Sequence, residues 1–297
     1  MAKTRSTSLI LAYLTISALV CMRSSPGLAA SPKPEIVYYN QGAESVSTKS
    51  FSFRVLTLAL SKSGHAYDLE PSPLGRTSAL RAQQAIANGE AMDVAWLGVS
   101  KTTDDQLWPI RIPIDRGIQG YRLFLIDGAR QAEFSRIKSL NDLKKMTALQ
   151  GADWPDTSIL RSAGLRVNTG SFTHLCHMLM GGRGDYFPRD ISEAFAEQAR
   201  ICKPEHGIAV EQTLVLHYTL AGMFYVRKSN KRLHDDIERG FTAAYDDGSY
   251  MALYHADAEI QSAIKLARFK TRRVIEIDNP FVSPDAKKID KRFWLNP

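Results

Sequence analysis

The chain has 297 residues, and 38 Lys and Arg against 31 Asp and Glu give it a formal charge of +7. Its first 30 residues contain three basic side chains and no acidic one, so the remainder carries about +4. The basic residues of that remainder are spread along the chain among acidic ones, which argues against a nucleic-acid partner. The length suits one large or two medium domains.

Residues 1–30 have the pattern of a secretory signal peptide. Two basic residues come before an apolar run over 9–20, and small residues end the segment at Ala29 and Ala30. The apolar run is too short to serve as a permanent membrane span. We therefore expect cleavage near Ala30 and export to the periplasm, with an uncleaved membrane anchor as the alternative.

Two cysteines, Cys176 and Cys202, remain after cleavage. In an oxidising compartment two cysteines favour one disulfide. The alternative is a zinc site, because His174 and His177 flank Cys176 at helical spacing and His206 follows Cys202. A disulfide would consume the thiolates, so we predict the disulfide, no metal and no cofactor.

The first part of the chain after the leader alternates strands with helices. Strand-like segments are expected at 35–39, 67–70 and 93–97, and helices at 51–60 and 76–88, the second ended by Gly89. This β-α-β-α-β order predicts a mostly parallel sheet.

A second α/β unit follows an extended segment at 110–114 and a strand at 121–126. Ser139 is placed to cap a helix over 139–145, and Asp156 or Thr157 to cap another. Further helices are expected at 172–180 and 191–200, and strands at 147–150, 185–187 and 208–210.

The chain then leaves this unit through a strand at 222–226. Two helices come next: Leu233, Ile237, Phe241 and Tyr245 form the apolar stripe of the first, and Ser249 is placed to cap the second.

Five strings of sequence resemble extracellular solute-binding proteins of family 3, which have the type 2 periplasmic binding fold. They are GEAMDVAWLGVS at the cleft strand, PIRIPIDRGIQGYRLFLI at the crossover, SLNDLKKMTALQGADWPDTSIL, GRGDYFPRDISEA and FYVRKSNKRLHDDIERGFTAAYDDGSYMALY, and together they cover most of 36–255. The resemblance implies an α/β fold of two lobes joined by two crossover strands, with a ligand in the cleft. It places 31–117 and 222–297 in lobe one and 118–221 in lobe two. Closure about a hinge would hold a ligand that touches both lobes.

One family feature is missing. Relatives that bind amino acids carry Thr-x-x-x-Arg after the first cleft strand, and the arginine pairs with the carboxylate of the ligand. The corresponding run here, SKTTDDQ over 100–106, has no arginine and two acidic residues. The resemblance therefore predicts the fold and leaves the ligand open.

The candidate ligand-binding residues lie at strand ends, at the crossover and in the loop before a helix, where this fold places its ligand. Core packing is the alternative for Trp96, helix capping for Asp190, and a polar hinge surface for the crossover residues. The full set is Tyr39, Asn40, Trp96, Ser100, Asp115, Gln119, Tyr121, Asp153, Trp154, Ser158 and Asp190.

We expect an exported monomer that captures a small polar solute by lobe closure, performs no chemistry, and serves a membrane transporter or sensor. One alternative is a sensory or scaffold protein that keeps the lobes without a ligand. Another is a periplasmic, dehydratase-like enzyme, in which Asp115 and Asp190 would form the acid–base pair. Against it, the sequence has neither a nucleophile elbow nor a Gly-rich phosphate loop.

Overall fold

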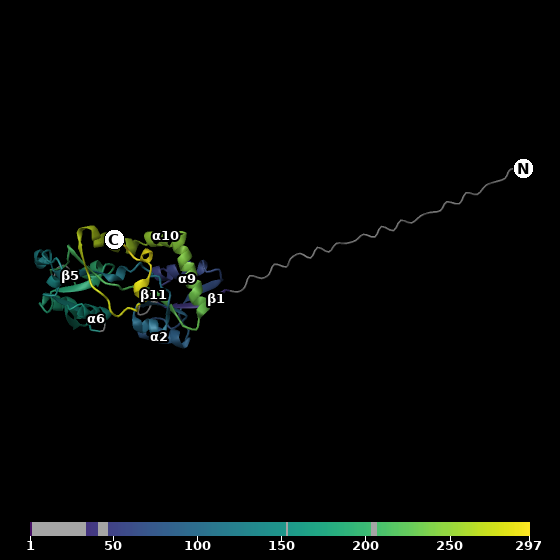
Figure 1. Ribbon diagram of the computed structural model, residues 1–297, viewed down its shortest axis with the longest axis horizontal. Coiled ribbons are helices and arrows are strands. Elements are labelled where there is room, and N and C mark those ends of the chain that lie inside the picture. The colour runs from purple at the N-terminus through teal and green to yellow at the C-terminus, as the bar shows by residue number, and fades with distance from the viewer. Residues whose placement is uncertain (2–33, 41–46, 153, 203–206) are drawn as a thin grey trace. The chain divides into compact units, whose positions relative to one another are not determined.

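The computed structural model describes residues 1, 34–40, 47–152, 154–202 and 207–297 (Figure 1). Residues Pro34–Pro297 form one compact unit. The predicted signal peptide lies outside the described residues. Among the residues that are described, no helix is long and apolar enough to cross a membrane.

The first sheet has five strands in the order β2-β1-β3-β11-β4. β1 pairs in parallel with β2 and β3, since helices α1 and α2 provide the crossovers. β11 enters from the later part of the chain and pairs antiparallel with β3 and β4. The elements are β1 Glu35–Asn40, α1 Phe51–Ser61, β2 Tyr67–Pro71, α2 Ala79–Asn88, β3 Val94–Gly98, α3 Lys101–Gln106, β4 Trp108–Pro109 and β11 Gly222–Val226.

The second sheet has seven strands in the order β12-β10-β5-β8-β6-β7, with β9 paired to β5. It lies towards the other end of the compact unit from β1 and β11 (Figure 1). The elements are β5 Tyr121–Asp127, α4 Gln131–Phe134, α5 Leu140–Leu143, β6 Thr147–Gly151, α6 Pro155–Ser162, β7 Arg166–Gly170, α7 Phe172–Met180, β8 Tyr186–Asp190, α8 Ala194–Arg200, β9 Ile208–Val210, β10 Leu214–His217 and β12 Arg273–Glu276.

Both sheets are mixed. The prediction of mostly parallel sheets holds for the β-α-β runs, where β1 pairs with β2 and β6 with β7. It does not hold for β5 and β11, which pair antiparallel with their neighbours. These two strands carry the chain from one sheet to the other, and each enters its sheet antiparallel to the strands beside it.

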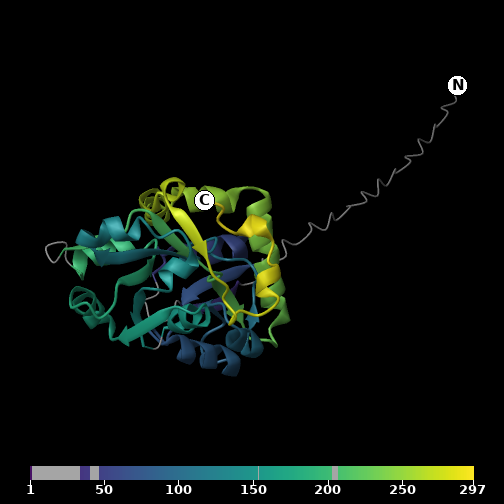
Figure 2. The same cartoon turned by 60° about the vertical axis from the view of Figure 1, so that its left-hand side comes forward.

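The C-terminal segment belongs to both sheets. β12, which the predicted boundaries assign to lobe one, pairs in parallel with β10 in the second sheet. The yellow chain then returns to the green helices (Figure 2), where Phe293 lies edge-on to Tyr245 at 4.8 Å and Arg292 pairs with Asp246 at 2.7 Å. The tail therefore contacts both parts of the fold.

Three helices follow β11: α9 Lys231–Asp246, α10 Ser249–Ala256 and α11 Ala258–Ala267. The predicted stripe of α9 is confirmed, because Leu233, Ile237 and Phe241 are buried. The single helix predicted after Ser249 is two helices. Asp257 separates them, since its extended backbone ends α10 and its side chain accepts the N–H of Ile260 in α11 at 2.9 Å.

Some predicted helix caps are wrong and others are confirmed. Trp154 occupies the N-cap of α6, and Asp156 and Thr157 lie inside its first turn because Pro155 starts the helix. Gly248, not Ser249, is the N-cap of α10. Ser139 does cap α5, and Gly89 ends α2 with a φ of 73°.

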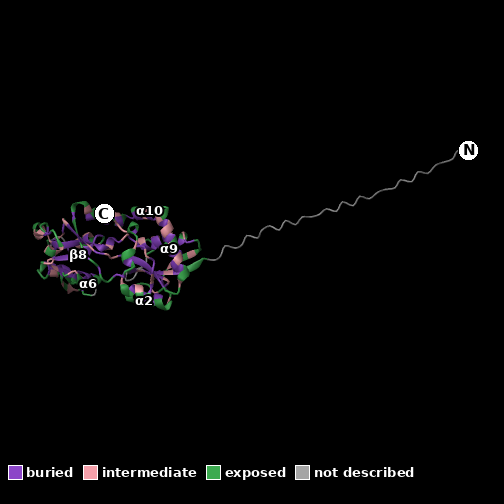
Figure 3. Cartoon of the chain, viewed as in Figure 1, coloured by how far each residue is buried: buried purple, intermediate pink, exposed green. Residues whose placement is uncertain are grey.

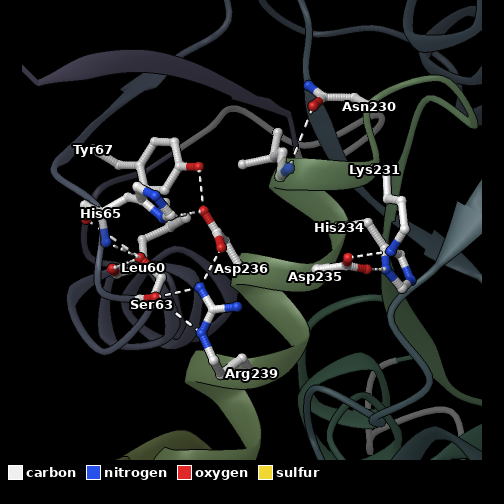
Figure 4. Close-up of polar contacts among 11 residues, drawn as sticks. Leu60, Ser63, His65, Tyr67, Asn230, Lys231, His234, Asp235, Asp236 and Arg239 are labelled. Atoms are coloured by element: carbon white, nitrogen blue, oxygen red, sulfur yellow. Dashed lines mark hydrogen bonds and ion pairs between the residues drawn. The ribbon is translucent and has the colours of Figure 1, made fainter.

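Helices α1 and α9 pack together on the first sheet, whose strands β3 and β11 are mostly buried, and the outer helix faces are exposed (Figure 3). Gly240 permits this contact, because a Cβ there would lie 1.9 Å from the carbonyl oxygen of Ala59. A polar cluster ties α9 to β2 (Figure 4): the buried Asp236 accepts the hydroxyl of Tyr67 at 2.7 Å and pairs with Arg239. The second sheet is reinforced by the predicted disulfide, which joins Cys176 of α7 to Cys202.

Candidate functional site

A cavity of about 580 Å³ is lined by elements of both sheets. It is bounded by the start of α1, the end of β3, the crossover between β4 and β5, the segment after β8, and the start of α11. The lining residues that carry polar or aromatic side chains are Ser50, Phe51, Ser52, Trp96, Asp115, Gln119, Asp190, Ser192, Glu193, Asp257 and Glu259.

Asp115 lies in a tight turn of the crossover. The turn is made by Arg116 and Gly117, with φ of 61° and 74°. Its geometry directs the N–H of Gly117 to Oδ1 of Asp115 at 3.0 Å. Asp115 is 9% exposed, and within the described chain its Oδ2 receives no hydrogen bond from another residue and the carboxylate has no ion-pair partner. Burial raises the pKa of Asp115 to about 7, with a further contribution from the charge of Asp190.

Asp190 ends β8 and also lines the cavity. Its Oδ1 accepts the N–H groups of Ser192 at 2.8 Å and Glu193 at 3.1 Å, and the hydroxyl of Ser192 at 2.5 Å. This carboxylate thus organises the turn before α8, as the capping alternative expects. It also lines the cavity and, like Asp115, has no ion-pair partner among the described residues.

The remaining acidic residues of the cavity differ in how far the protein neutralises them. Asp257 pairs with Arg54, and Glu193 pairs with Arg189 at 2.5 Å. Glu259 is exposed and unpaired. No lysine, arginine or histidine is among the described residues that line this cavity. The cavity therefore presents five carboxylates, three of them without a basic partner.

Two aromatic side chains complete the lining. Trp96 lies over Gly222 of β11, where a Cβ would be 2.1 Å from the indole Nε1. Phe51 starts α1 and contacts Tyr250 and Tyr254 edge-on at 6.4 and 6.0 Å. Both rings are partly exposed, so the cavity offers apolar faces beside its carboxylates.

The structure brings four of the predicted site residues together around this cavity: Trp96, Asp115, Gln119 and Asp190. Others from the same half of the fold lie in the core or at helix ends. Tyr39 lies between Phe53 and Phe224, and Ser100 caps α3 by accepting the N–H of Thr103. Asn40 is fully buried and donates to the carbonyl of Gly75 at 2.7 Å.

The predicted residues of the second sheet lie away from the cavity as well. Tyr121 stacks on His217 at 4.1 Å, Trp154 covers the guanidinium of Arg189 at 4.5 Å, and Ser158 is exposed on α6. Asp153 lies outside the described residues. The ligand role of each of these residues stays a prediction.

The start of α6, which follows the predicted ligand residues Asp153 and Trp154, contains a carboxylate of the protein itself. Asp156 is buried in its first turn, pairs with the equally buried Arg122 at 2.9 Å and accepts the hydroxyl of Tyr218. Burial alone would lower the pKa of Arg122, but Tyr218 and the carboxylates of Asp156, Asp190 and Glu193 raise it. Arg122 of β5 lies opposite Asp190 of β8 in the sheet, and its ion pair is with Asp156.

The acidic residues that replace the family arginine have structural contacts. Asp104 is 6% exposed at its side chain and pairs with Arg111 at 3.1 Å. It also accepts the hydroxyls of Tyr225 at 2.7 Å and Ser283 at 2.5 Å. Asp105 is exposed and pairs with Lys101. Helix α3 therefore anchors β11 and the C-terminal segment.

The zinc alternative loses its thiolates, since Cys176 and Cys202 are bonded to each other. Of the two histidines on α7, His174 contacts Ser171 at 2.6 Å. Among the described residues there is no group of three or more His, Cys, Asp or Glu placed to hold a metal ion. His206 lies outside the described residues.

No family model matches the sequence, and no curated protein matches it. Solved structures do. YckB of Bacillus subtilis is 17% identical with a TM-score of 0.51, over 82% of this chain and 97% of its own. The binding component of an ABC transporter from Wolinella succinogenes, complexed with lysine, is 15% identical with a TM-score of 0.52, over 77% and 98%. The ligand-binding core of GluR0 in complex with L-glutamate is 14% identical with a TM-score of 0.51, over 76% and 98%.

This chain has their two-lobed α/β fold. The predicted fold class is confirmed, and the identities of 14 to 17% establish the fold alone. In such a fold a cavity lined from both sheets is where ligands bind, as open α/β sheets bind ligands beyond the ends of their strands.

Sequence reasoning missed part of the cavity. Phe51 was expected only as the start of a helix, and Ser50, Asp257 and Glu259 were not among the predicted ligand-binding residues. Their signal was the helix start itself: both segments begin with a capping residue, and both helix starts point at the cavity. Glu193 was missed because helix 191–200 was expected to begin earlier than α8 does.

Proposed function

We propose that this protein binds a small polar solute in the cavity between its two lobes and does no chemistry on it. The observation that carries the proposal is the cavity of about 580 Å³, lined by polar side chains from both sheets. Its volume lies within the range of small-molecule sites, roughly 300–1,000 Å³. A ligand that touches both lobes favours the closed arrangement, which is how such a protein retains it.

Two further points support a binding role for an exported protein. The W. succinogenes relative in fold is a binding component of a transporter and holds lysine, and GluR0 holds glutamate. The N-terminal 30 residues have a signal-peptide pattern. We infer an exported monomer with lobes near 31–117 with 222–297 and 118–221, which delivers its solute to a membrane transporter or a sensor.

The test is a thermal-shift screen of the protein without residues 1–30 against amines, amino acids, organic acids and sugars. A true ligand at 100 times its Kd stabilises the folded state by about 2.7 kcal/mol. The ligand is then recovered and weighed by mass spectrometry, so that an unchanged mass separates binding from turnover by Asp115 and Asp190. A flat response across the whole panel would contradict a solute-binding role and favour the sensory or scaffold alternative.

A further inference from the structure

The cavity combines net negative charge with a buried carboxylate, that of Asp115, which has no ion-pair partner among the described residues. Five of its lining residues are acidic and none of those described is basic. The protein supplies Arg54 to Asp257 and Arg189 to Glu193, and no described basic side chain forms an ion pair with Asp115, Asp190 or Glu259. A buried carboxylate without a partner is costly, and a bound cation would remove that cost.

Asp115 is the strongest single indication. It is 9% exposed, lines the cavity, and accepts the N–H of Gly117 at Oδ1, with a further contact from its own backbone. Within the described chain no other residue donates to its Oδ2. The protein's own geometry thus holds one carboxylate oxygen in place and leaves the second for a donor that enters the cavity.

Arg54 and Arg189 are already paired with the cavity acids Asp257 and Glu193. Two further arginines near the first sheet and β5 are engaged elsewhere. Arg111, near the missing family arginine, pairs with Asp104 at 3.1 Å and lies outside this cavity. Arg122 pairs with Asp156 at 2.9 Å. A ligand carboxylate placed in the cavity would meet Asp115 and Asp190 with no basic side chain among the described lining residues, which is unfavourable.

We propose that the solute is a small organic cation that lacks a carboxylate, with ammonium groups held by Asp115 and Asp190 and a carbon chain against Trp96 and Phe51. This rests on the proposed function, since it names the class of solute for the same cavity. An organic cation fits better than a metal ion, because no three acidic or histidine side chains of the described residues converge closely enough to hold one.

Calorimetric titration at pH 8 tests the proposal with two matched pairs of probes. Cadaverine is lysine without its carboxylate, and agmatine is arginine without its carboxylate. We expect cadaverine or agmatine to bind at least about 100-fold more tightly than the amino acid with the same side chain, because the cavity cannot pair a carboxylate. Glucose is the test for a neutral solute, and calcium chloride is the test for a metal ion.

Three variants locate the site. Asp115→Asn and Asp190→Asn should each weaken binding of the amine about 30-fold or more, since each removes one half of a buried charge pair. Asp105→Asn changes an exposed acid on α3 that lies outside the cavity, and should leave the affinity unchanged. Circular dichroism establishes that each variant is folded; Asn keeps the shape of the side chain, so it can still accept the turn hydrogen bonds.

The outcomes separate the two proposals. If lysine or arginine binds as tightly as its amine, or if glucose or calcium alone binds, the class of solute proposed here is overturned while the binding role stands. If no probe binds here and the wider screen above is flat too, both are overturned. Amine binding that survives both Asp→Asn changes would place the amine outside this cavity and also contradict the assignment.

Discussion

Asp104 and Asp115 both have buried side chains, and they differ in what surrounds them. Asp104 receives two hydroxyls and a guanidinium from Tyr225, Ser283 and Arg111. In the described chain, Asp115 is contacted by backbone N–H groups, that of Gly117 and its own, and by no hydroxyl or guanidinium. The first carboxylate is satisfied by the protein and joins three segments, whereas the second is held in position and left incomplete at a cavity. A buried charge that the fold does not neutralise indicates a binding role more strongly than burial or sequence position does.

The first test of this comparison removes the carboxylate of Asp104, which the protein itself holds. Asp104→Ala should lower the free energy of unfolding by about 3–5 kcal/mol, since it leaves Arg111 and two hydroxyls without their partner. Urea denaturation of the ligand-free protein measures this. The affinity of the folded variant for a ligand of the cavity should change little. A loss of less than about 1 kcal/mol would show that Asp104 is not the anchor described here.

The second test is to neutralise Asp115. This change should raise the free energy of unfolding, whereas Asp104→Ala should lower it. The pKa of Asp115 is raised to about 7 in the fold, so the native state holds its proton more tightly than the unfolded state does between about pH 4 and 7. The contribution of this group to stability is therefore present at low pH and lost as the pH rises to 7. Asp115→Asn removes that loss and should stabilise the ligand-free protein at pH 8 by about 2–4 kcal/mol.

The matched measurement is the same variant at pH 3.5, where both side chains are neutral. There the difference in the free energy of unfolding should disappear. Asp105→Asn serves as the control for a charge that is exposed in the fold. If Asp115→Asn were destabilising at pH 8, the carboxylate would have to be satisfied by a contact within the protein, and the contrast with Asp104 would fail.

The third concerns the pH dependence of binding. Cadaverine keeps both its charges below pH 8, so a change in affinity reports on the protein. Protonation of Asp115 should weaken binding about 10-fold or more between pH 8 and pH 5.5. Asp190, Glu193, Asp257 and Glu259 also face the cavity, so Asp115→Asn should reduce the pH slope and need not abolish it. A slope unchanged in this variant would assign the titration to those other acids.

The smallest expected effect concerns the aromatic wall. Trp96→Phe keeps a ring over Gly222 but reduces the face offered to a cation or its carbon chain, so affinity should fall about 2- to 5-fold. Stability should change little, because the indole is only partly buried. Calorimetry of the variant measures the change. An unaltered affinity would show that Trp96 serves packing alone.

Sequence could predict the order of elements because their periodic patterns are local. The strands at 35–40, 94–98 and 222–226, the stripe of α9 and the C-cap at Gly89 all follow from side-chain spacing and turn chemistry. β7 and β10 were not expected, because they are short and are fixed by pairing with distant strands. The resemblance to family 3 predicted the two lobes, which no local pattern does.

The site was less predictable, for a physical reason. Asp104, Asp115 and Asp156 are alike in sequence, and only the structure separates the two that are neutralised by Arg111 and Arg122 from the one that is not. Asp257 and Glu259 reach the cavity through the packing of α11, which spacing along the chain does not encode. The missing family arginine was visible in the sequence, and it indicated a departure from amino-acid binding without naming what replaces it.

The most direct test of the account is the pKa of Asp115 itself, measured by NMR titration of its side-chain carboxyl in the protein with and without cadaverine. We expect a value near 7 in the free protein, well above the ordinary range of an aspartate, and a clear decrease when the amine is bound, because the cation stabilises the charged form. A pKa that is ordinary in the free protein, or one that cadaverine does not change, would contradict the claim that this carboxylate is left for a cationic solute.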